Sequence, residues 1–194
     1  MNNGQQLAAG GDRKKRRELD FYPTPPEVTV ALLDFLEMPF SKIWEPACGD
    51  GSMSRVLESY GGHEVISADI RETEYGAGGV DFLQTRMDGQ GIHAIITNPP
   101  FAMSEQFIRH ALSHDVQVVA MVLKSQYWHA AKRRVLFEEF PPAYVLAMTW
   151  RPDFMGGERG GAPTMECHWT VWIQGCKDTR YRLLQKPRTS CLVI

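Results

Sequence analysis

The chain has 194 residues and lacks any long apolar segment. Its longest nearly uncharged apolar run covers residues 116–123, whereas a helix that spans a membrane takes about 20 apolar residues. The N-terminus also lacks the hydrophobic core of a secretory signal, because its charges come after small and polar residues. We therefore expect a soluble, cytoplasmic protein with no membrane contact.

Cysteine is scarce, and the four cysteines are widely spaced, with no CxxC pair and no second cluster. This spacing excludes the common zinc sites and a disulfide framework. The six histidines have no spacing typical of metal ligands either. The sequence therefore predicts no metal centre and fits a reducing compartment.

The chain has no general excess of positive charge, since its formal net charge is −2. Residues 1–20 carry five basic and three acidic side chains, and residues 175–194 carry five and one, so the segment between them has a net charge of −8. This distribution excludes a uniformly cationic nucleic-acid binder. Contacts with phosphates must come from local basic groups, such as residues 13–17, residues 132–134 and the C-terminal end.

The composition is otherwise that of an ordinary globular protein, with 43% hydrophobic and 23% charged residues, which excludes a disordered or collagen-like chain. The length predicts one domain. We expect a flexible basic arm at residues 1–20, one folded domain at residues 21–174 and a basic tail at residues 175–194.

Apolar periodicity and breaker residues predict strands that alternate with helices. The predicted helices cover residues 25–36, 52–60, 104–113 and 127–139, and the predicted strands cover residues 42–46, 64–68, 93–97, 116–123, 144–149 and 168–173, with a short extended piece at residues 80–83. This order indicates an α/β fold with a mostly parallel twisted sheet, helices on both faces and ligands at the carboxyl ends of the strands. No helix fits between the last two strands, so we expect an antiparallel terminal hairpin that closes one edge of the sheet.

The segment Thr24-Pro25-Pro26-Glu27 has the pattern of a helix start. Thr24 fits the N-cap position, and Glu27 is placed to reach back to it as in a capping box. The sequence alone therefore predicts a structural role for these residues.

The motif EPACGDG at residues 45–51 falls where a strand ends and a helix begins. Two glycines there allow the backbone to approach a ligand closely. The next strand ends in Asp69, where a carboxylate can accept hydrogen bonds from ribose hydroxyls. A third glycine of the dinucleotide-binding pattern is missing, and Glu45 adds negative charge. The motif therefore favours an adenosine-containing ligand with a cationic group, such as a sulfonium or an ammonium, over a pyrophosphate.

The motif Asn98-Pro99-Pro100-Phe101 follows the strand predicted at residues 93–97. The two prolines hold the segment extended and stiff. The side-chain oxygen of Asn98 and the carbonyl oxygen of Pro99 can both accept hydrogens from an exocyclic amine, while Phe101 stacks on its ring. Trp150 or Phe154 is expected to contact the other face of that ring.

These motifs, in this order after FYPTP at residues 21–25, resemble those of class I S-adenosylmethionine-dependent amino-methyltransferases, specifically the DNA N6-adenine group. The resemblance runs from about residue 21 to residue 173, and its downstream part is similar to small orphan methyltransferases carried by bacteriophages. It implies a Rossmann-like methyltransferase fold and a bacterial or phage-infected cell as the location. It assigns cofactor binding to eight residues, which are Tyr22, Thr24, Glu45, Ala47, Gly49, Asp69, Asp81 and Phe82. It assigns catalysis to Asn98, Pro99, Pro100 and Phe101.

The activity that the resemblance implies is methylation of the N6 amino group of adenine in DNA, with the base flipped out of the duplex. Only about twenty residues follow residue 173, so we expect short or relaxed sequence recognition by the arm, the glycine-rich loop at residues 150–163 and the tail. No feature of the sequence supports a homo-oligomer. A cytosine C5 mechanism is excluded, because no Pro-Cys pair occurs.

Two alternatives remain open at this point. The same motif serves other planar amines, so the acceptor is also compatible with cytosine N4, an RNA base or a protein glutamine. The other alternative is a non-catalytic protein that binds nucleic acid or cofactor.

Overall fold

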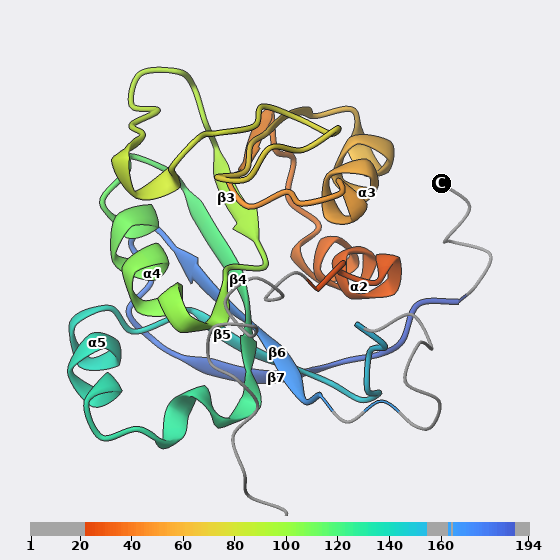
Figure 1. Cartoon of the computed structure of the whole chain (residues 1–194). Coiled ribbons are helices and arrows are strands. Elements are labelled where there is room, and N and C mark those ends of the chain that lie inside the picture. The colour runs from red at the N-terminus through yellow and green to blue at the C-terminus, as the bar shows by residue number, and fades with distance from the viewer. Residues whose placement is uncertain (1–21, 155–162, 164, 189–194) are drawn as a thin grey trace, which may run out of the picture.

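The computed structural model describes residues 22–154, 163 and 165–188, and these residues form one seven-stranded sheet (Figure 1). The strand order is β2-β1-β3-β4-β6-β5-β7. β2, β1, β3 and β4 are parallel, whereas β6 is antiparallel to both of its neighbours. The strands are β1 (Lys42–Glu45), β2 (Glu64–Ser67), β3 (Ala94–Thr97), β4 (Val118–Lys124), β5 (Tyr144–Met148), β6 (Cys167–Ile173) and β7 (Arg180–Leu184).

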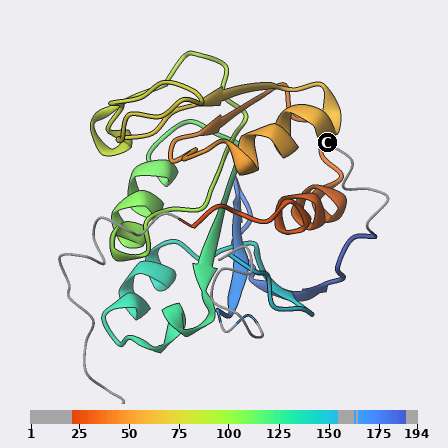
Figure 2. The ribbon, with the colours of Figure 1, turned by 45° about the vertical axis from the view of Figure 1, so that its right-hand side comes forward.

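Helices cover both faces of the sheet, as the sequence predicts. α2 and α3 lie on one face, and α4 and α5 lie on the other (Figures 1 and 2). The helices are α2 (Pro26–Leu36), α3 (Ser52–Gly61), α4 (Ser104–Leu112) and α5 (Arg133–Glu139), with short 3-10 turns η1 (Phe82–Gln84), η2 (Phe101–Met103) and η3 (Ser125–His129). Among the described residues, none of the helices is both long enough and apolar enough to cross a bilayer.

The central strand β4 is covered by helices on both faces, which explains why its sequence is a nearly continuous apolar run. Val118 and Val122 belong to the core under α2 and α3, and Val119 and Leu123 belong to the core under α4 and α5. All four side chains are at most 2% exposed. Because successive side chains of a strand point to opposite faces, a strand covered on both faces needs apolar residues at every position.

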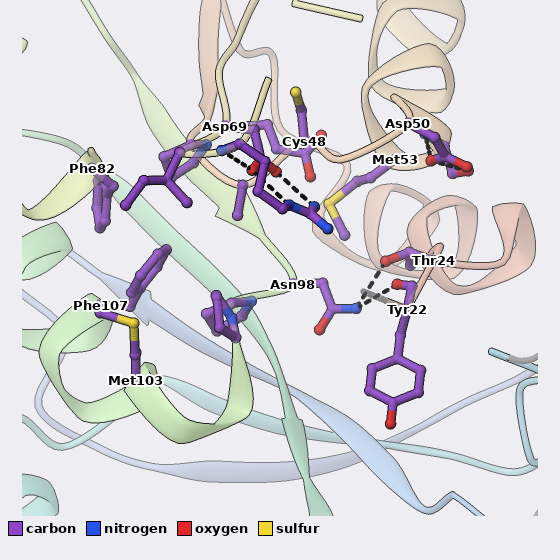
Figure 3. Close-up of a pocket in the computed structure, with 18 of the residues that line it drawn as sticks. Tyr22, Thr24, Cys48, Asp50, Met53, Asp69, Phe82, Asn98, Met103 and Phe107 are labelled. Carbon is purple, nitrogen blue, oxygen red and sulfur yellow. Dashed lines mark hydrogen bonds and ion pairs between the residues drawn. The ribbon is translucent and has the colours of Figure 1, made fainter. Parts of the chain in front are cut away.

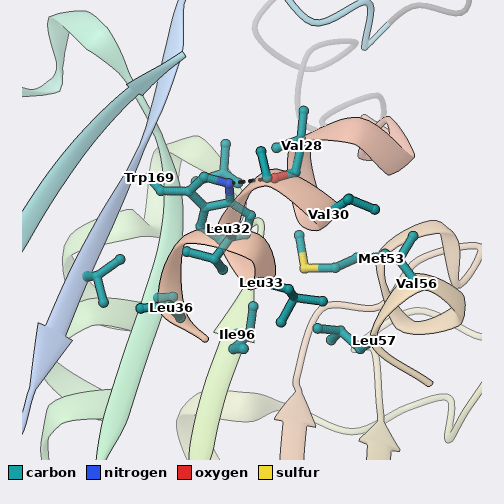
Figure 4. Packing of buried hydrophobic residues seen from close by; sticks show 14 of the residues in the cluster. Val28, Val30, Leu32, Leu33, Leu36, Met53, Val56, Leu57, Ile96 and Trp169 are labelled. Carbon is teal, nitrogen blue, oxygen red and sulfur yellow. Dashed lines mark hydrogen bonds between the residues drawn. The ribbon is translucent and has the colours of Figure 1, made fainter. Parts of the chain in front are cut away.

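Trp169 of β6 fixes α2 to the sheet (Figure 4). Its side chain is fully buried, and its indole Nε1 donates a hydrogen bond to the carbonyl oxygen of Val28 at 2.9 Å. Leu32 and Leu36, further along α2, are part of the same core cluster. This contact therefore sets the position of α2 and of the residues directly ahead of it.

The terminal hairpin is confirmed as antiparallel, but the expectation that it closes an edge of the sheet is wrong. β6 lies between β4 and β5, and β7 pairs in parallel with β5 and forms the edge. β7 falls within the expected basic tail, and only its last residue, Leu184, is buried. Because Arg180 and Arg182 are exposed on this edge strand, its sequence shows no apolar run.

The helix predicted at residues 127–139 is interrupted. η3 ends at His129, and α5 begins only at Arg133. The indole of Trp128 donates to Nε2 of His168 in β6 at 3.0 Å and stacks on Phe137, so tertiary contacts define the turn. The extended piece predicted at residues 80–83 is also wrong in part, because a 3-10 turn begins at Phe82.

Candidate functional site

A pocket of about 260 Å³ lies at the carboxyl ends of β1, β2 and β3 (Figure 3). Glu45 is the last residue of β1, Asp69 comes two residues after β2, and Asn98 follows β3 directly. Parallel strands bring these ends together at one edge of the sheet. The predicted site residues that line the pocket are Tyr22, Thr24, Glu45, Ala47, Asp69, Asp81, Phe82, Asn98, Pro99, Pro100 and Phe101.

Gly49 is the one predicted site residue that does not line the pocket. Its N–H donates to Oδ2 of Asp69 at 2.9 Å, so it helps to orient a carboxylate that does line the pocket. Gly49 and Gly51 have φ angles of 57° and 82°, a region that favours glycine. A Cβ atom on Gly51 would lie 2.3 Å from Cγ of Tyr75. The turn therefore needs glycine for both its conformation and its packing.

Glu45 is a buried carboxyl group inside the pocket, with 2% of its surface exposed. Burial is the main reason why its pKa rises to about 8, and the negative charges of Asp69 and Asp50 add to the shift. The hydroxyl of Ser54 donates to Oε2 and opposes the shift. Glu45 is therefore mostly uncharged at neutral pH in this structure.

We expect Glu45 to make the free energy of unfolding fall as pH rises from about 4.5 to about 8. The pKa of Glu45 is about 8 in the folded protein and 4.5 in a free side chain, so between these values the folded state holds a proton that the unfolded state has lost. This stabilisation is complete below pH 4.5 and is lost as pH rises through about 8. It amounts to at most about 1.4 kcal/mol per pH unit.

The variant Glu45→Gln keeps the size of the side chain but cannot ionise. Urea denaturation of both proteins at several pH values between about 6 and 9 measures the effect. We expect the stability of the variant to depend less on pH. Parallel curves for the two proteins would show that Glu45 is not the group responsible.

Asp69 is an ionised carboxylate whose acceptor sites are all in use. Oδ1 accepts from the backbone N–H and Nε of Arg71, and Oδ2 accepts from Nη2 of Arg71 and from the N–H of Gly49, at 2.9 to 3.1 Å. Burial raises the pKa of Asp69, but these hydrogen bonds outweigh it and hold the pKa below the ordinary value. A carboxylate has about four acceptor sites. Hydroxyl groups of a ligand can therefore reach Asp69 only after the side chain of Arg71 moves away.

The side-chain amide of Asn98 has a defined orientation (Figure 3). Nδ2 donates to the carbonyl oxygen of Tyr22 at 3.3 Å and to the hydroxyl oxygen of Thr24 at 3.1 Å. Because a backbone carbonyl can only accept, these contacts require the nitrogen on that side. Oδ1 then points away from both residues, is buried, and has no hydrogen-bond partner among the described residues. A buried acceptor of this kind is uncommon and suits a donor from a ligand.

The capping box predicted for Thr24 is wrong. The N-cap of α2 is Pro25, with no side-chain hydrogen bond to the helix end. The hydroxyl of Thr24 instead accepts from Asn98, and Pro26, Glu27 and Val28 begin the helix without it. The hydroxyl of Thr24, which the local sequence pattern assigned to the helix end, therefore binds a residue far away in the sequence.

Aromatic rings meet beside the Asn98 corner. The ring centroids of Phe101 and Tyr22 are 5.8 Å apart, and Nζ of Lys124 lies 4.1 Å from the centroid of Phe101. The expectation for Phe154 is wrong, because its side chain is 4% exposed and packs in the core under α2. Trp150 packs against the same core cluster, as do Tyr22 and Phe101, so its expected contact with the base stays a prediction.

Asp81 and Phe82 line the pocket at η1. Oδ1 of Asp81 accepts from the N–H of Leu83 at 2.9 Å and caps that turn. Phe82 is 2% exposed, and its ring centroid lies 4.9 Å from that of Trp44 and 4.8 Å from that of Phe107. Both residues are therefore held rigidly.

Sequence reasoning missed several residues that line the pocket, including Met53, Ile70, Arg71, Met103 and Phe107. Met103 and Phe107 are four residues apart just after NPPF, so helical spacing gave a signal for a shared face. Arg71 gave no such signal, because its position depends on the side chain folding back onto Asp69.

The pocket contains a cysteine, Cys48, whose thiol is not suited to thiolate chemistry. Burial, together with the charges of Glu45 and Asp69, raises the pKa of Cys48 to about 12, so its thiol stays protonated. In the part of the chain that the structure describes, no cluster of three His, Cys, Asp or Glu side chains could hold a metal ion. The chemistry of the pocket therefore depends on carboxylates, an amide and aromatic rings.

No protein-family model matches the chain, and no curated protein matches it either. Solved structures do match. A candidate RNA methyltransferase from Pyrococcus horikoshii has a TM-score of 0.61 at 14% identity, over 86% of this chain and 92% of that one. A candidate class I S-adenosylmethionine-dependent methyltransferase from Listeria monocytogenes has a TM-score of 0.60 at 11% identity, over 86% of this chain and 66% of that one.

The modification subunit of a candidate type I restriction enzyme from Vibrio vulnificus is a third match, with a TM-score of 0.58 at 12% identity. The alignment covers 91% of this chain and 50% of that subunit, so the chain spans about half of its length. At these identities the comparisons establish the fold, which is that of the class I methyltransferases. The α/β architecture predicted from the sequence is thereby confirmed.

Proposed function

We propose that the protein transfers a methyl group from S-adenosylmethionine to the N6 amino group of adenine in DNA. The observation that carries the proposal is Oδ1 of Asn98, a buried acceptor with no partner among the described residues, in a pocket that is also lined by the carboxyl groups of Glu45, Asp50, Asp69 and Asp81. An exocyclic amine is the donor that fits this acceptor. The order of the sequence motifs, from Tyr22 to Phe101, supports the same assignment.

The residues of the pocket fit S-adenosylmethionine. When bound, this cofactor supplies an electrophilic methyl group on a positively charged sulfur. Glu45 favours a cationic group nearby, because positive charge stabilises the ionised form of its carboxyl group. Asp69 would accept hydrogen bonds from the ribose hydroxyls once Arg71 has moved, and Asp81 and Phe82 would contact the adenine of the cofactor.

The Asn98 corner would hold the amine that receives the methyl group. Oδ1 of Asn98 and the carbonyl oxygen of Pro99 would accept its two hydrogens, which localises the lone pair on nitrogen and stabilises the positive charge that develops there. The ring of Phe101 would stack on the base, and Pro99 and Pro100 keep the corner stiff. Catalysis then depends mainly on positioning, since no covalent enzyme intermediate is needed.

Two of the comparisons support nucleic acid as the substrate class. One structural neighbour is a modification subunit of a candidate restriction enzyme, which supports DNA. Another is a candidate RNA methyltransferase, so methylation of an RNA base is the second candidate. The arm at residues 1–20, most of the loop at residues 150–163 and the end of the tail lie outside the described residues, so short or relaxed sequence recognition stays a prediction.

Transfer of labelled methyl groups to unmethylated DNA and RNA, followed by nucleoside analysis of the products, tests the proposal. We expect N6-methyladenine in DNA. Random-sequence DNA treated with the enzyme and sequenced at modified sites should show a short target. The proposal fails if the purified protein binds the cofactor and modifies no nucleobase, and label found only in RNA would support the second candidate.

A further inference from the structure

A second pocket, of about 290 Å³, adjoins the segment that carries Phe101. It is lined by residues of η2, α4, η3 and the start of α5, together with the residue just ahead of α5. Phe101 lines both pockets, whereas Met103 and Phe107 line only the first, and Gln106 and Arg109 line only the second. Phe101 is therefore a wall that the two pockets share.

The second pocket carries unpaired positive charge. Lys132 and Arg133 line it, and neither has a carboxylate partner among the residues that the structure describes. Arg109 and Glu105 also line it, and the guanidinium of Arg109 pairs with two carboxylates, that of Glu105 at 3.3 Å and that of Glu139 at 2.7 Å. Lys132 and Arg133 are therefore the positive side chains of this pocket that are left to attract an anion.

Arg133 is held in position by an aromatic ring and a backbone carbonyl. Its guanidinium carbon lies 3.7 Å from the centroid of the Tyr127 ring, and Nη1 donates to the Tyr127 carbonyl oxygen at 2.7 Å. These contacts leave other N–H groups of the guanidinium for a ligand. Lys124 contributes a further cation over the ring of Phe101. The positive groups thus gather around the wall that the two pockets share.

We propose that the second pocket binds a phosphodiester group of the substrate strand, beside the nucleotide whose base enters the Asn98 corner. This inference rests on the function proposed above. If Phe101 stacks on that base, the attached sugar and phosphate leave the first pocket past Phe101, next to Lys132 and Arg133. A phosphate suits these side chains, because it is an anion with several acceptor oxygens. The pocket positions the strand and reads no sequence.

Binding of a labelled oligonucleotide, measured by fluorescence anisotropy over a range of NaCl concentrations, tests the proposal independently of methyl transfer. Lys132→Ala and Arg133→Gln each remove one charge from the second pocket. Arg134→Gln is the matched control, because Arg134 is the next residue along the chain, does not line the pocket and pairs with Glu138 at 3.4 Å. DNA and RNA strands of the same sequence share the phosphodiester chemistry, and comparing them shows which strand the pocket accepts.

We expect Lys132→Ala and Arg133→Gln each to weaken binding about 10-fold near physiological salt and to reduce the slope of log K against log[NaCl] by about 0.7 to 0.9. Arg134→Gln should change affinity by less than about 2-fold. Arg133→Lys keeps the charge and should restore most of the slope.

The proposal is overturned if the pocket variants leave the salt slope unchanged, if Arg134→Gln has an equal effect, or if the wild-type protein binds no strand. Failure of the proposed function is a separate result. If Lys132 and Arg133 contribute to strand binding but no base is methylated, the phosphate site is supported and the proposed function is refuted. If adenine is methylated but the slope of log K against log[NaCl] is unchanged in both variants, the proposed function is supported and the phosphate site is refuted.

Discussion

Replacing Asn98 by alanine is expected to lower the rate of methyl transfer about 100- to 1,000-fold, with little change in the affinity for S-adenosylmethionine. The side-chain oxygen is a buried acceptor with no hydrogen-bond partner in the described part of the chain, and under the proposed function it contacts the amine while positive charge develops. Single-turnover kinetics measure the rate, and titration calorimetry measures the affinity. A rate within about 3-fold of the wild-type rate would contradict the proposed role.

Thr24→Val separates chemistry from positioning. The substitution keeps the size of the side chain and removes the hydroxyl that accepts from Nδ2 of Asn98 at 3.1 Å. Asn98 then keeps its acceptor oxygen but loses one of the two contacts that orient the amide. We expect a smaller decrease in rate than for Asn98→Ala. Equal decreases would mean that Asn98 acts only by holding the chain ahead of α2.

Asp69→Asn is expected to raise the Kd for S-adenosylmethionine by roughly 10- to 100-fold, because a hydrogen bond to a charged group contributes about 1.5 to 3 kcal/mol. The amide retains one acceptor oxygen and loses the charge. Titration calorimetry measures the Kd, and the rate at saturating cofactor should change much less than the Kd. An unchanged Kd would show that the ribose binds elsewhere.

Arg71→Ala is the matched variant with the opposite expected sign. The guanidinium donates two hydrogen bonds to Asp69, through Nε and Nη2, and the backbone N–H, which the variant keeps, donates a third. Removing the guanidinium therefore frees two acceptor sites for the ribose hydroxyls. The Kd for the cofactor should therefore fall. A rise in Kd would show that Arg71 contacts the cofactor rather than competing with it.

Much of the fold was predictable because buried positions produce a recognisable pattern of apolar residues in the sequence. Val118 and Val119 face opposite layers of helices, so β4 reads as an uninterrupted apolar run. β7 has no such apolar pattern, since most of its side chains are exposed at the edge of the sheet, namely Arg180, Tyr181, Arg182 and Leu183. Apart from the buried side chain of Leu184, backbone hydrogen bonds define that strand, and they do not depend on side-chain type.

The location of the site was predictable for a topological reason, and its internal contacts were not. Parallel strands place Glu45, Asp69 and Asn98 at one edge whatever their exact contacts. The partner of Thr24 is 74 residues away in the sequence, and a local pattern cannot show it. The contact of Arg71 with Asp69 is close in sequence, but it depends on one rotamer of a long side chain.

The hydrogen bonds between Asn98 and the residues ahead of α2 make the rate of methyl transfer depend on how tightly α2 packs against the sheet. Tyr22 and Thr24 orient the amide, and the indole of Trp169 holds the start of the helix through Val28. Loosening this distant contact would let the acceptor oxygen of Asn98 rotate out of line while the strand ends that carry Glu45 and Asp69 stay in place. Lost activity would then be an early sign of a weakened core, seen before global unfolding.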